Sequence, residues 1–307
     1  MAVENIIKET LKDITSAKKL YDEPMSRHAS LCVGGKADAL VMIENEEQLI
    51  GIVKRLIAKK IDYLPTGNLT NIIVRDGGYR GAILLMKGLK KTNHQYSPES
   101  GHTISAQAGA SLSAVVSLAL AQELSGMEFC AGIPGSVGGA VWMNAGAYGK
   151  EIKDVIENVY LLDASGEKKE MRREEINFEY RKTELPPRAI ILGASFKLEK
   201  GNGEEIKKRI TEIMKWRQEK HPLEYPNAGS IFKNIPGQPA GRIIEEMGMK
   251  GESIGGARIS PKHANFIVNT GKATASEVLH LISLVQKKAR EEKGINLETE
   301  VVIIGDE

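Results

Sequence analysis

The sequence predicts an α+β protein, in which helices and short strands follow one another without a strict βαβ order. Three observations support this. Apolar residues recur at helical spacing in several segments, short apolar runs lie between turn residues, and no internal repeat is present. The length of 307 residues allows two domains. Because the composition changes at the run Lys-Gly-Asn-Gly over 200–203, we expect one domain over 1–199 and a smaller one over 200–307.

The first third of the chain is expected to combine two helices with short strands. Apolar residues share one face of a helix over 4–14. Asn45 begins a second helix, with Gln48 three residues on as its capping partner. The expected strands cover 37–44, 61–65, 71–74 and 81–86.

The remaining helices carry recognisable ends. Ser111 starts a helix that we expect to run to Gly126, because glycine commonly follows the last helical residue. Thr274 and Glu277 form a capping box for a helix that ends at Gly294. A further helix is expected at 204–219, and strands at 103–108, 156–163, 167–172, 189–199 and 298–304.

Composition and charge exclude several functional classes. A net charge of +2, with 41% hydrophobic and 27% charged residues, is typical of a globular protein and argues against a nucleic-acid partner. No apolar run has membrane-spanning length, and the N-terminus lacks the pattern of a signal peptide, so we expect a cytoplasmic protein without a membrane partner. Cys32 and Cys130 are expected to be reduced and buried. The six histidines show no metal-ligand spacing, so no metal site is predicted.

Six glycines fall within residues 132–149. Glycine loses backbone entropy on folding, so such a density indicates that backbone N–H groups approach a ligand, most commonly a phosphate. Apolar residues of this run, Trp142 included, are expected to be buried. The turn over 66–71 has a similar small, polar composition, and neither segment matches the Rossmann or Walker patterns. We infer a diphosphate held by two loops; two purely structural turns are the alternative.

Six separated segments resemble the UDP-N-acetylenolpyruvoylglucosamine reductase family. The resemblance covers nearly the whole chain and is to the shorter form of the family, which lacks an additional tyrosine-bearing loop. The segments are IPGSVGGAVWMNAGAYGKEI, the upstream AGASLSAVVSLALAQELSGMEF, Tyr180-Arg181, NAGSIFKN at 227–234, GMKGESIGGARISPKHANFIVN at 248–269, and LETEVVIIG at 297–305.

This resemblance implies a fold, a cofactor and a reaction. The fold is an FAD-binding domain of the vanillyl-alcohol-oxidase type, with two α+β subdomains that divide near 75–90, and a smaller C-terminal α+β substrate domain whose last strand packs back on the N-terminal part. FAD is held without a covalent bond. The implied enzyme is an oxidoreductase, UDP-N-acetylmuramate dehydrogenase, which uses NADPH to reduce UDP-N-acetylglucosamine enolpyruvate to UDP-N-acetylmuramate. It serves peptidoglycan precursor synthesis, and through it cell-wall biogenesis, cell shape and cell division.

The resemblance also implies which residues contact FAD. They come from both loops, and Leu69 and Thr70 stand where the family usually has glycine and serine. Leu69 can offer a phosphate only its backbone N–H. For Asn144 and Tyr148, packing is as good an interpretation as a cofactor contact. The implied FAD contacts are Gly67, Asn68, Leu69, Thr70, Asn71, Gly135, Ser136, Gly138 and Gly139.

Three distant residues are implied to carry the reaction. Ser230 matches the proton donor, and Arg181 matches the arginine that binds the substrate carboxylate and disperses enolate charge. Glu300 matches the active-site glutamate; strand alternation places Glu298 on its own face, so the choice between them depends on the family match. Substrate-diphosphate contacts are expected from Lys220 and Lys233.

Two alternatives remain open from the sequence. The first is an oxidase of the same flavin fold that acts on another alcohol, which would favour a covalent flavin attachment; no histidine or cysteine is clearly placed for one. The second is a flavin-binding protein without activity. The set Arg181, Ser230 and Glu300 argues against it, and Leu69 argues weakly for it.

Overall fold

A computed structural model describes residues 3–307. Met1 and Ala2, the first residues of the N-terminus that lacks a signal-peptide pattern, lie outside the described residues. The chain forms two compact units. Unit 1 consists of the residues up to Leu20, Ala39–Asn68 and Gly81–Trp216. Unit 2 consists of Tyr21–Asp38, Leu69–Arg80 and Arg217–Glu307. Two N-terminal segments therefore pack with the C-terminal part, so the units are not the two consecutive stretches expected on either side of residue 200.

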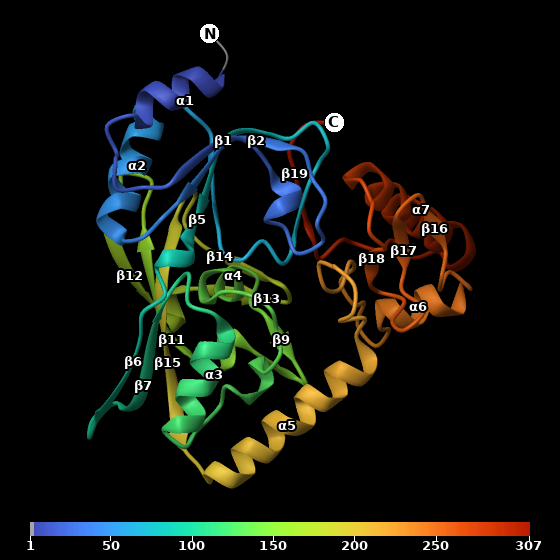
Figure 1. Cartoon of the computed structure of the whole chain (residues 1–307). Helices are drawn as coiled ribbons and strands as arrows, with labels where there is room; N and C mark the ends of the chain where they lie inside the picture. The colour runs from blue at the N-terminus through green and yellow to red at the C-terminus, as the bar shows by residue number, and fades with distance from the viewer. Residues whose placement is uncertain (1–2) are drawn as a thin grey trace. The chain divides into compact units, whose positions relative to one another are not determined.

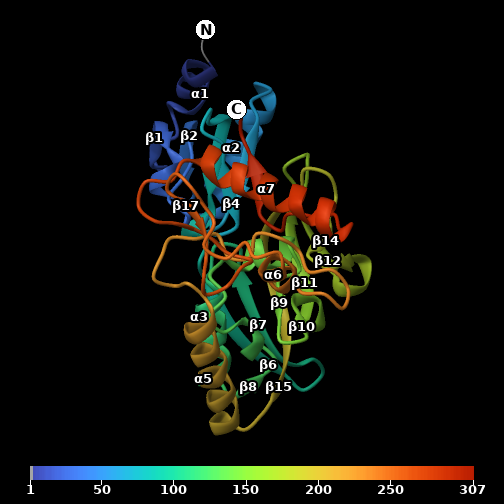
Figure 2. The ribbon, with the colours of Figure 1, turned by 90° about the vertical axis from the view of Figure 1, so that its right-hand side faces the viewer.

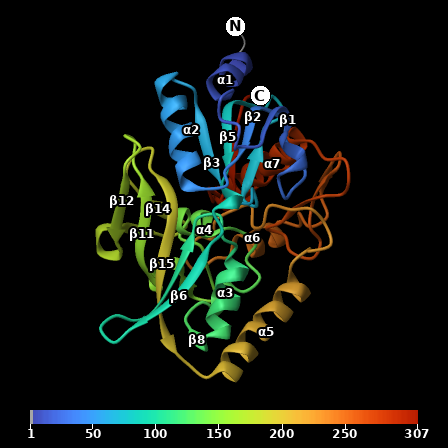
Figure 3. The same ribbon diagram turned by 60° about the vertical axis from the view of Figure 1, so that its left-hand side comes forward.

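Unit 1 contains an antiparallel sheet with the strand order β12-β11-β15-β7-β6 (Figures 1 and 3). Helices α3 (Leu112–Ala121) and α4 (Val137–Trp142) pack against it and share its hydrophobic core. The central strand β15 is buried from Ile190 to Phe196, as its continuous apolar run predicts. The strands are β6 (Thr92–Ser97), β7 (Gly101–Gln107), β11 (Ile156–Leu162), β12 (Lys168–Arg172) and β15 (Ile190–Lys200), with β8 (Leu124–Ser125) beside the end of β15.

A second, four-stranded sheet has the order β1-β2-β5-β3, and β3 runs parallel to β5. Helix α2 begins as predicted, because the Asn45 side chain accepts a hydrogen bond from the Gln48 N–H at 2.9 Å. The strands of this sheet are β1 (Lys19–Pro24), β2 (Lys36–Met42), β3 (Tyr63–Thr66) and β5 (Tyr79–Leu85). The helices in this part of the sequence are α1 (Val3–Leu11) and α2 (Glu46–Ala58).

Unit 2 is built around helix α7 (Ala275–Lys293), which packs on a three-stranded sheet of order β16-β17-β18 and on α6 (Ala240–Glu246) (Figure 2). The predicted capping box of Thr274 and Glu277 is present, and Gly294 ends the helix in the left-handed conformation. The last strand pairs in parallel with β4. The strands are β4 (Ile72–Val74), β16 (Ser253–Ile254), β17 (Ala257–Ile259), β18 (Ile267–Asn269) and β19 (Val302–Ile304).

Burial and hydrogen bonds explain why N-terminal segments belong to unit 2. Leu31 and Ile73 are fully buried in the same core as the C-terminal residues. The Asn269 side chain donates to the Leu31 carbonyl at 3.1 Å. The Asp76 carboxylate accepts the Ala275 N–H at 3.0 Å and so caps the start of α7. These contacts join residues about 200 positions apart in the sequence, which local patterns do not reveal.

The remaining regular elements are one long helix and two small hairpins. Helix α5 (Gly203–Lys220) carries the chain from unit 1 into unit 2. Among the helices of residues 3–307, none is long and apolar enough to cross a membrane. The hairpin strands are β9 (Gly146–Ala147), β10 (Lys150–Glu151), β13 (Asn177–Glu179) and β14 (Lys182–Glu184).

Three predicted element ends are wrong. Helix α1 ends at Leu11 and not at residue 14. Helix α3 stops at Ala121 and not at Gly126, because Glu123 adopts a left-handed φ of 51° and the next two residues pair with β15. The last strand begins at Val302 and not at residue 298, so Glu300 precedes it. The structure also contains elements that we did not predict: helices α4 and α6 and strands β1, β6, β8, β9, β10, β13, β14, β16, β17 and β18.

Two predicted burials are also wrong. Cys32 is exposed, whereas Cys130 is buried as expected. The Trp142 side chain is 55% exposed at the end of α4, while Val137 and Val141 on the same helix are buried. A six-residue helix turns only one face toward the sheet, and Trp142 lies outside that face.

Candidate active site

The loop from Gly67 to Asn71 connects β3 to β4. Within residues 3–307, the N–H groups of Gly67, Asn68 and Leu69 donate no hydrogen bond. Leu69 has a left-handed φ of 54°. Consecutive unpaired N–H groups at such a turn form a concavity that binds anions. The loop therefore has the backbone chemistry expected of a phosphate-binding loop.

Leu69 occupies a backbone conformation that glycine adopts freely. A non-glycine residue in the left-handed region costs about 1–2 kcal/mol. The Leu69 side chain is 2% exposed, and burial of a leucine contributes about 1.5–3 kcal/mol. Burial of the Leu69 side chain therefore offsets the cost of its left-handed backbone conformation.

The glycine-rich run uses several of its N–H groups inside the protein. The Val137 N–H donates to the Ala110 carbonyl and the Gly138 N–H to the Ala108 carbonyl, both at 2.8 Å. The Gly139 N–H donates to Ser136 Oγ at 3.3 Å. These three groups are satisfied without a ligand, so in this segment much of the glycine content serves close packing against the end of β7.

The structure brings the two loops together. A Cβ atom added to Gly67 would lie 1.9 Å from Ser136 Oγ, so the backbone of the first loop contacts the N-cap of α4. Only glycine permits this approach. Gly67 and Ser136 are 69 positions apart in the sequence, yet they are in contact within unit 1.

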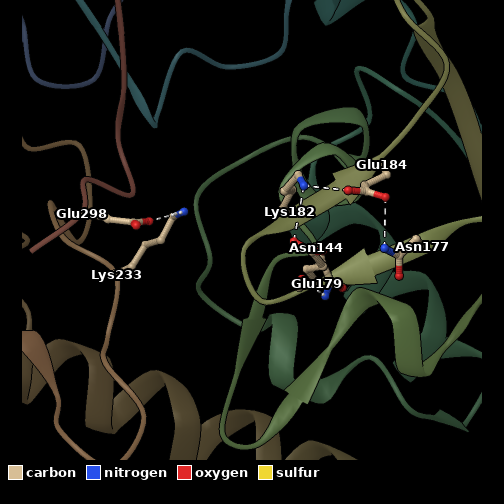
Figure 4. A network of polar contacts seen from close by, with 7 residues as sticks. All are labelled: Asn144, Asn177, Glu179, Lys182, Glu184, Lys233 and Glu298. Carbon is tan, nitrogen blue, oxygen red and sulfur yellow. Dashed lines mark hydrogen bonds and ion pairs between the residues drawn. The ribbon is translucent and has the colours of Figure 1, made fainter.

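Asn144 has a packing role, one of the two interpretations left open by its sequence. Its side chain is fully buried and donates to Glu151 Oε2 at 2.9 Å and to the Glu179 carbonyl at 3.0 Å. Its oxygen accepts the Lys153 N–H at 3.0 Å. Asn144 therefore joins the glycine-rich run to Glu151 of β10 and to Glu179 of β13. Figure 4 shows Asn144 beside Glu179.

Arg181 lies at the turn between β13 and β14, with a left-handed φ of 58°. Its Nη2 donates to the Gly146 carbonyl at 2.9 Å, and its guanidinium lies 4.9 Å from the Tyr180 ring centroid. Lys182 and Glu184, two residues apart on β14, form an ion pair at 2.7 Å (Figure 4). Arg181 is thus positioned by the glycine-rich run, which the sequence spacing did not indicate.

We expect Asn144→Ala to lower the free energy of unfolding by about 3 kcal/mol, because it removes three hydrogen bonds and leaves buried partners unsatisfied. Urea unfolding of the purified protein measures this. Asn5→Ala, an exposed position of α1, is the matched control and is expected to stay within about 0.5 kcal/mol of the parent. An Asn144→Ala variant as stable as the control would contradict the packing role.

Ser230 and Glu300 lie on adjoining segments of unit 2. The Glu300 N–H donates to the carbonyl of Ile231, the residue after Ser230, at 2.8 Å. The Asn71 side chain donates to the Glu300 carbonyl at 3.0 Å, which links this pair to the loop over 67–71. Both Ser230 and Glu300 are half-buried. Arg181, the third predicted residue, belongs to unit 1.

Glu298 differs from Glu300 in its surroundings. Its side chain is exposed and pairs with Lys233 Nζ at 3.2 Å (Figure 4). An exposed ion pair of this kind is solvated and contributes little to stability. The two glutamates therefore differ in exposure, and the assignment of Glu300 to the site stays a prediction from the family match.

A cavity of about 260 Å³ adjoins Ser230. Arg242 and Lys262 also line it, and the sequence analysis named neither as a site residue. Lys262 lies in the family-like segment Ser-Pro-Lys-His-Ala-Asn, and this resemblance could have indicated it as a site residue. Lys220 is exposed at the end of α5 and is not among the residues that line this cavity.

His263, which lines this cavity, and its neighbour His221 both have a lowered pKa. Burial lowers the pKa of His221 to about 4, and the nearby Arg217 adds to the effect. Burial also lowers the pKa of His263, whose Nδ1 accepts the Asn265 N–H at 3.2 Å. The two rings meet edge to face, with centroids 5.7 Å apart. His263 therefore has a structural hydrogen-bonding role.

Comparisons with known proteins agree with this description. Residues 37–172 match an FAD-binding domain family, and residues 221–304 match the C-terminal domain family of UDP-N-acetylenolpyruvoylglucosamine reductase. The chain is 46% identical over 301 residues to the UDP-N-acetylenolpyruvoylglucosamine reductase of Syntrophus aciditrophicus, covering 98% of this chain and 96% of that protein. It is 45% identical over 303 residues to that of Caldanaerobacter subterraneus subsp. tengcongensis, covering 98% and 99%.

A solved structure has the same fold. It is the UDP-N-acetylenolpyruvylglucosamine reductase of Thermus caldophilus, with a TM-score of 0.79 and 35% identity over 94% of this chain and 99% of that one. The fold and the matched domain define an FAD-binding protein with a C-terminal α+β domain, as predicted. The chain belongs to the UDP-N-acetylenolpyruvoylglucosamine reductase family of oxidoreductases.

Proposed function

We propose that this protein is a cytoplasmic, NADPH-dependent flavoenzyme that reduces UDP-N-acetylglucosamine enolpyruvate to UDP-N-acetylmuramate in peptidoglycan precursor synthesis. The observation that carries the proposal is the family relationship over nearly the whole chain, together with Ser230 and Glu300 on adjoining segments beside a cavity lined by cationic side chains.

The residues of the two loops fit a bound FAD. The unpaired N–H groups of Gly67, Asn68 and Leu69 suit its diphosphate, and Gly67 lets the first loop approach the Ser136 side chain of the second loop closely. The other proposed contacts are Thr70 and Asn71 in the first loop and Gly135, Gly138 and Gly139 in the second. When bound, FAD supplies hydride transfer from NADPH to the substrate.

The chain's own residues supply charge stabilisation and a proton. Reduction adds a hydride to the enolpyruvyl methylene carbon and a proton to the carbon that bears the carboxylate, so the double bond becomes a single bond. In our proposal Arg181 binds the substrate carboxylate and stabilises the developing enolate charge. The Ser230 hydroxyl gives its proton to the neighbouring carbon, and Glu300 orients the reacting groups.

Cationic side chains near Ser230 suit the diphosphate of the UDP-sugar. Arg242 and Lys262 line the cavity, and Lys233 lies three residues from Ser230. A nucleotide diphosphate is recognised by such groups through charge-assisted hydrogen bonds. We propose Lys233, Arg242 and Lys262 for this role. Lys220, placed at the end of α5, remains a prediction from the family match.

Two anaerobic half-reactions test the proposed function. The purified protein is expected to be yellow and to release its flavin on denaturation, because no covalent attachment is proposed. NADPH should bleach the flavin, and UDP-N-acetylglucosamine enolpyruvate should restore its colour with formation of one UDP-N-acetylmuramate per flavin. A colourless preparation would refute flavin binding. A flavin that NADPH reduces but the enolpyruvyl sugar does not reoxidise would favour an oxidoreductase with another substrate.

A further inference from the structure

Two histidines meet on the hairpin formed by β6 and β7. His94 Nε2 lies 3.1 Å from His102 Nδ1, and the two ring planes differ by 13°. The strand register pairs Tyr96 with His102 and His94 with Ile104, so the histidines are diagonal neighbours on one face of the hairpin. Both side chains are half-buried, and β6 is the edge strand of the sheet (Figure 3).

The distance between these nitrogens fits a shared metal ion. Two imidazole nitrogens at 3.1 Å hold one proton between them, with the lone pair of the acceptor directed at the donor. A tetrahedral Zn²⁺ about 2.0 Å from each of two nitrogens would separate them by about 3.3 Å. The separation of the two nitrogens therefore suits a shared metal ion, and each ring has to turn so that its lone pair faces the ion.

We propose that His94 and His102 form a binding site for a divalent transition-metal ion at this sheet edge. Imidazole nitrogen selects Zn²⁺, Cu²⁺ and Ni²⁺ over Mg²⁺ and Ca²⁺, which prefer oxygen ligands. Each ring must then carry its proton on the nitrogen remote from the metal, His94 Nδ1 and His102 Nε2. The Tyr96 ring packs against His102 with centroids 4.7 Å apart and restrains it in this orientation.

The site is open and reversible. Within residues 3–307, no group of three or more histidine, cysteine, aspartate or glutamate side chains is placed to hold a metal ion, so water completes the coordination. Binding joins the edge strand β6 to β7 through side chains, in addition to the backbone hydrogen bonds of the pair. The bound ion thus stabilises the hairpin reversibly. None of its ligands is a residue assigned to flavin or substrate.

Titration of the flavin-loaded, tag-free protein with Zn²⁺ tests the proposal. Calorimetry is expected to find one Zn²⁺ per chain, and His94→Gln and His102→Gln are each expected to weaken that binding at least tenfold. His280→Gln, an exposed single histidine on α7, is the matched control and should bind as the parent does. With Cu²⁺, electron paramagnetic resonance should show two coupled nitrogens in the parent and one in either hairpin variant.

Hydrogen exchange provides a local readout. Zn²⁺ is expected to slow amide exchange in residues 92–107 of the parent protein and to have no such effect in His94→Gln. Unchanged flavin content in the variants, with unchanged exchange elsewhere in unit 1, shows that they fold. The proposal fails if the parent binds no Zn²⁺ at millimolar concentration, or if both hairpin variants bind it as tightly as the parent does.

Discussion

Replacing Ser230 with alanine is expected to slow reduction of the enolpyruvyl substrate by about 10²–10⁴-fold, the usual contribution of a positioned proton donor. Reduction of the flavin by NADPH should continue at the parent rate, because that half-reaction needs no proton from Ser230. Stopped-flow absorbance of the flavin measures the two half-reactions separately. The Glu300 N–H bonds the carbonyl of Ile231 and not the serine hydroxyl, so the substitution leaves the backbone of this segment unchanged.

Two further variants make this result specific. Ser230→Cys keeps a proton donor at the same place and should recover part of the lost rate. Ser253→Ala, an exposed serine of β16, is the matched control in the same unit and should react as the parent does. If Ser230→Ala reoxidises its flavin with the enolpyruvyl sugar at the parent rate, the proton comes from another group and the role proposed for Ser230 is wrong.

The second large effect is expected from Gly67→Ala. The new Cβ would lie 1.9 Å from Ser136 Oγ and 2.9 Å from Ser136 Cβ, distances that real side chains do not tolerate. The loops must then separate, and the unpaired N–H groups of the first loop lose their arrangement. We expect purified Gly67→Ala to retain less than about a tenth of the parent flavin, because displacement of the loop over 67–71 removes several hydrogen bonds to the diphosphate at once.

A second substitution tests whether the clash is the cause. Ser136→Gly removes both clashing atoms and costs α4 only a few tenths of a kcal/mol as an N-cap. The double variant Gly67→Ala, Ser136→Gly should therefore regain flavin. Gly51→Ala, where a Cβ meets nothing within 4 Å inside α2, is the control and should stabilise the protein by about 1 kcal/mol. Full flavin content in Gly67→Ala alone would show that the loops do not depend on this contact.

Helix ends and strands with local signals were predictable from sequence. Asn45 and the box of Thr274 and Glu277 cap their helices as expected, because a cap is a hydrogen bond between residues three apart. The end of α3 was not predictable in this way. The backbone reverses at Glu123 so that Leu124 and Ser125 can pair with β15, about 75 residues later.

For the candidate site, too, the sequence predicted which residues take part but not how they are arranged. Its residues were found by their resemblance to a family, whose motifs are continuous in the sequence. Their arrangement was not predictable: Gly67 against Ser136, Arg181 against Gly146, and Glu300 beside the segment of Ser230 all join distant positions. The sequence also gave no reason to place His94 beside His102, because strand register decides which residues of a hairpin are neighbours.

By itself, the sequence determined the family, the α+β class and the chemistry available to the site, because residue types and local spacing carry that information. Only the tertiary structure decided that segments 21–38 and 69–80 belong with the C-terminal residues, and that Trp142 and Cys32 are exposed. It also decided that N–H groups remain free at Gly67–Leu69 while those of Val137, Gly138 and Gly139 are bonded within the described chain. The physical reason is that burial and hydrogen-bond partners depend on contacts between distant residues, which the order of residues does not record.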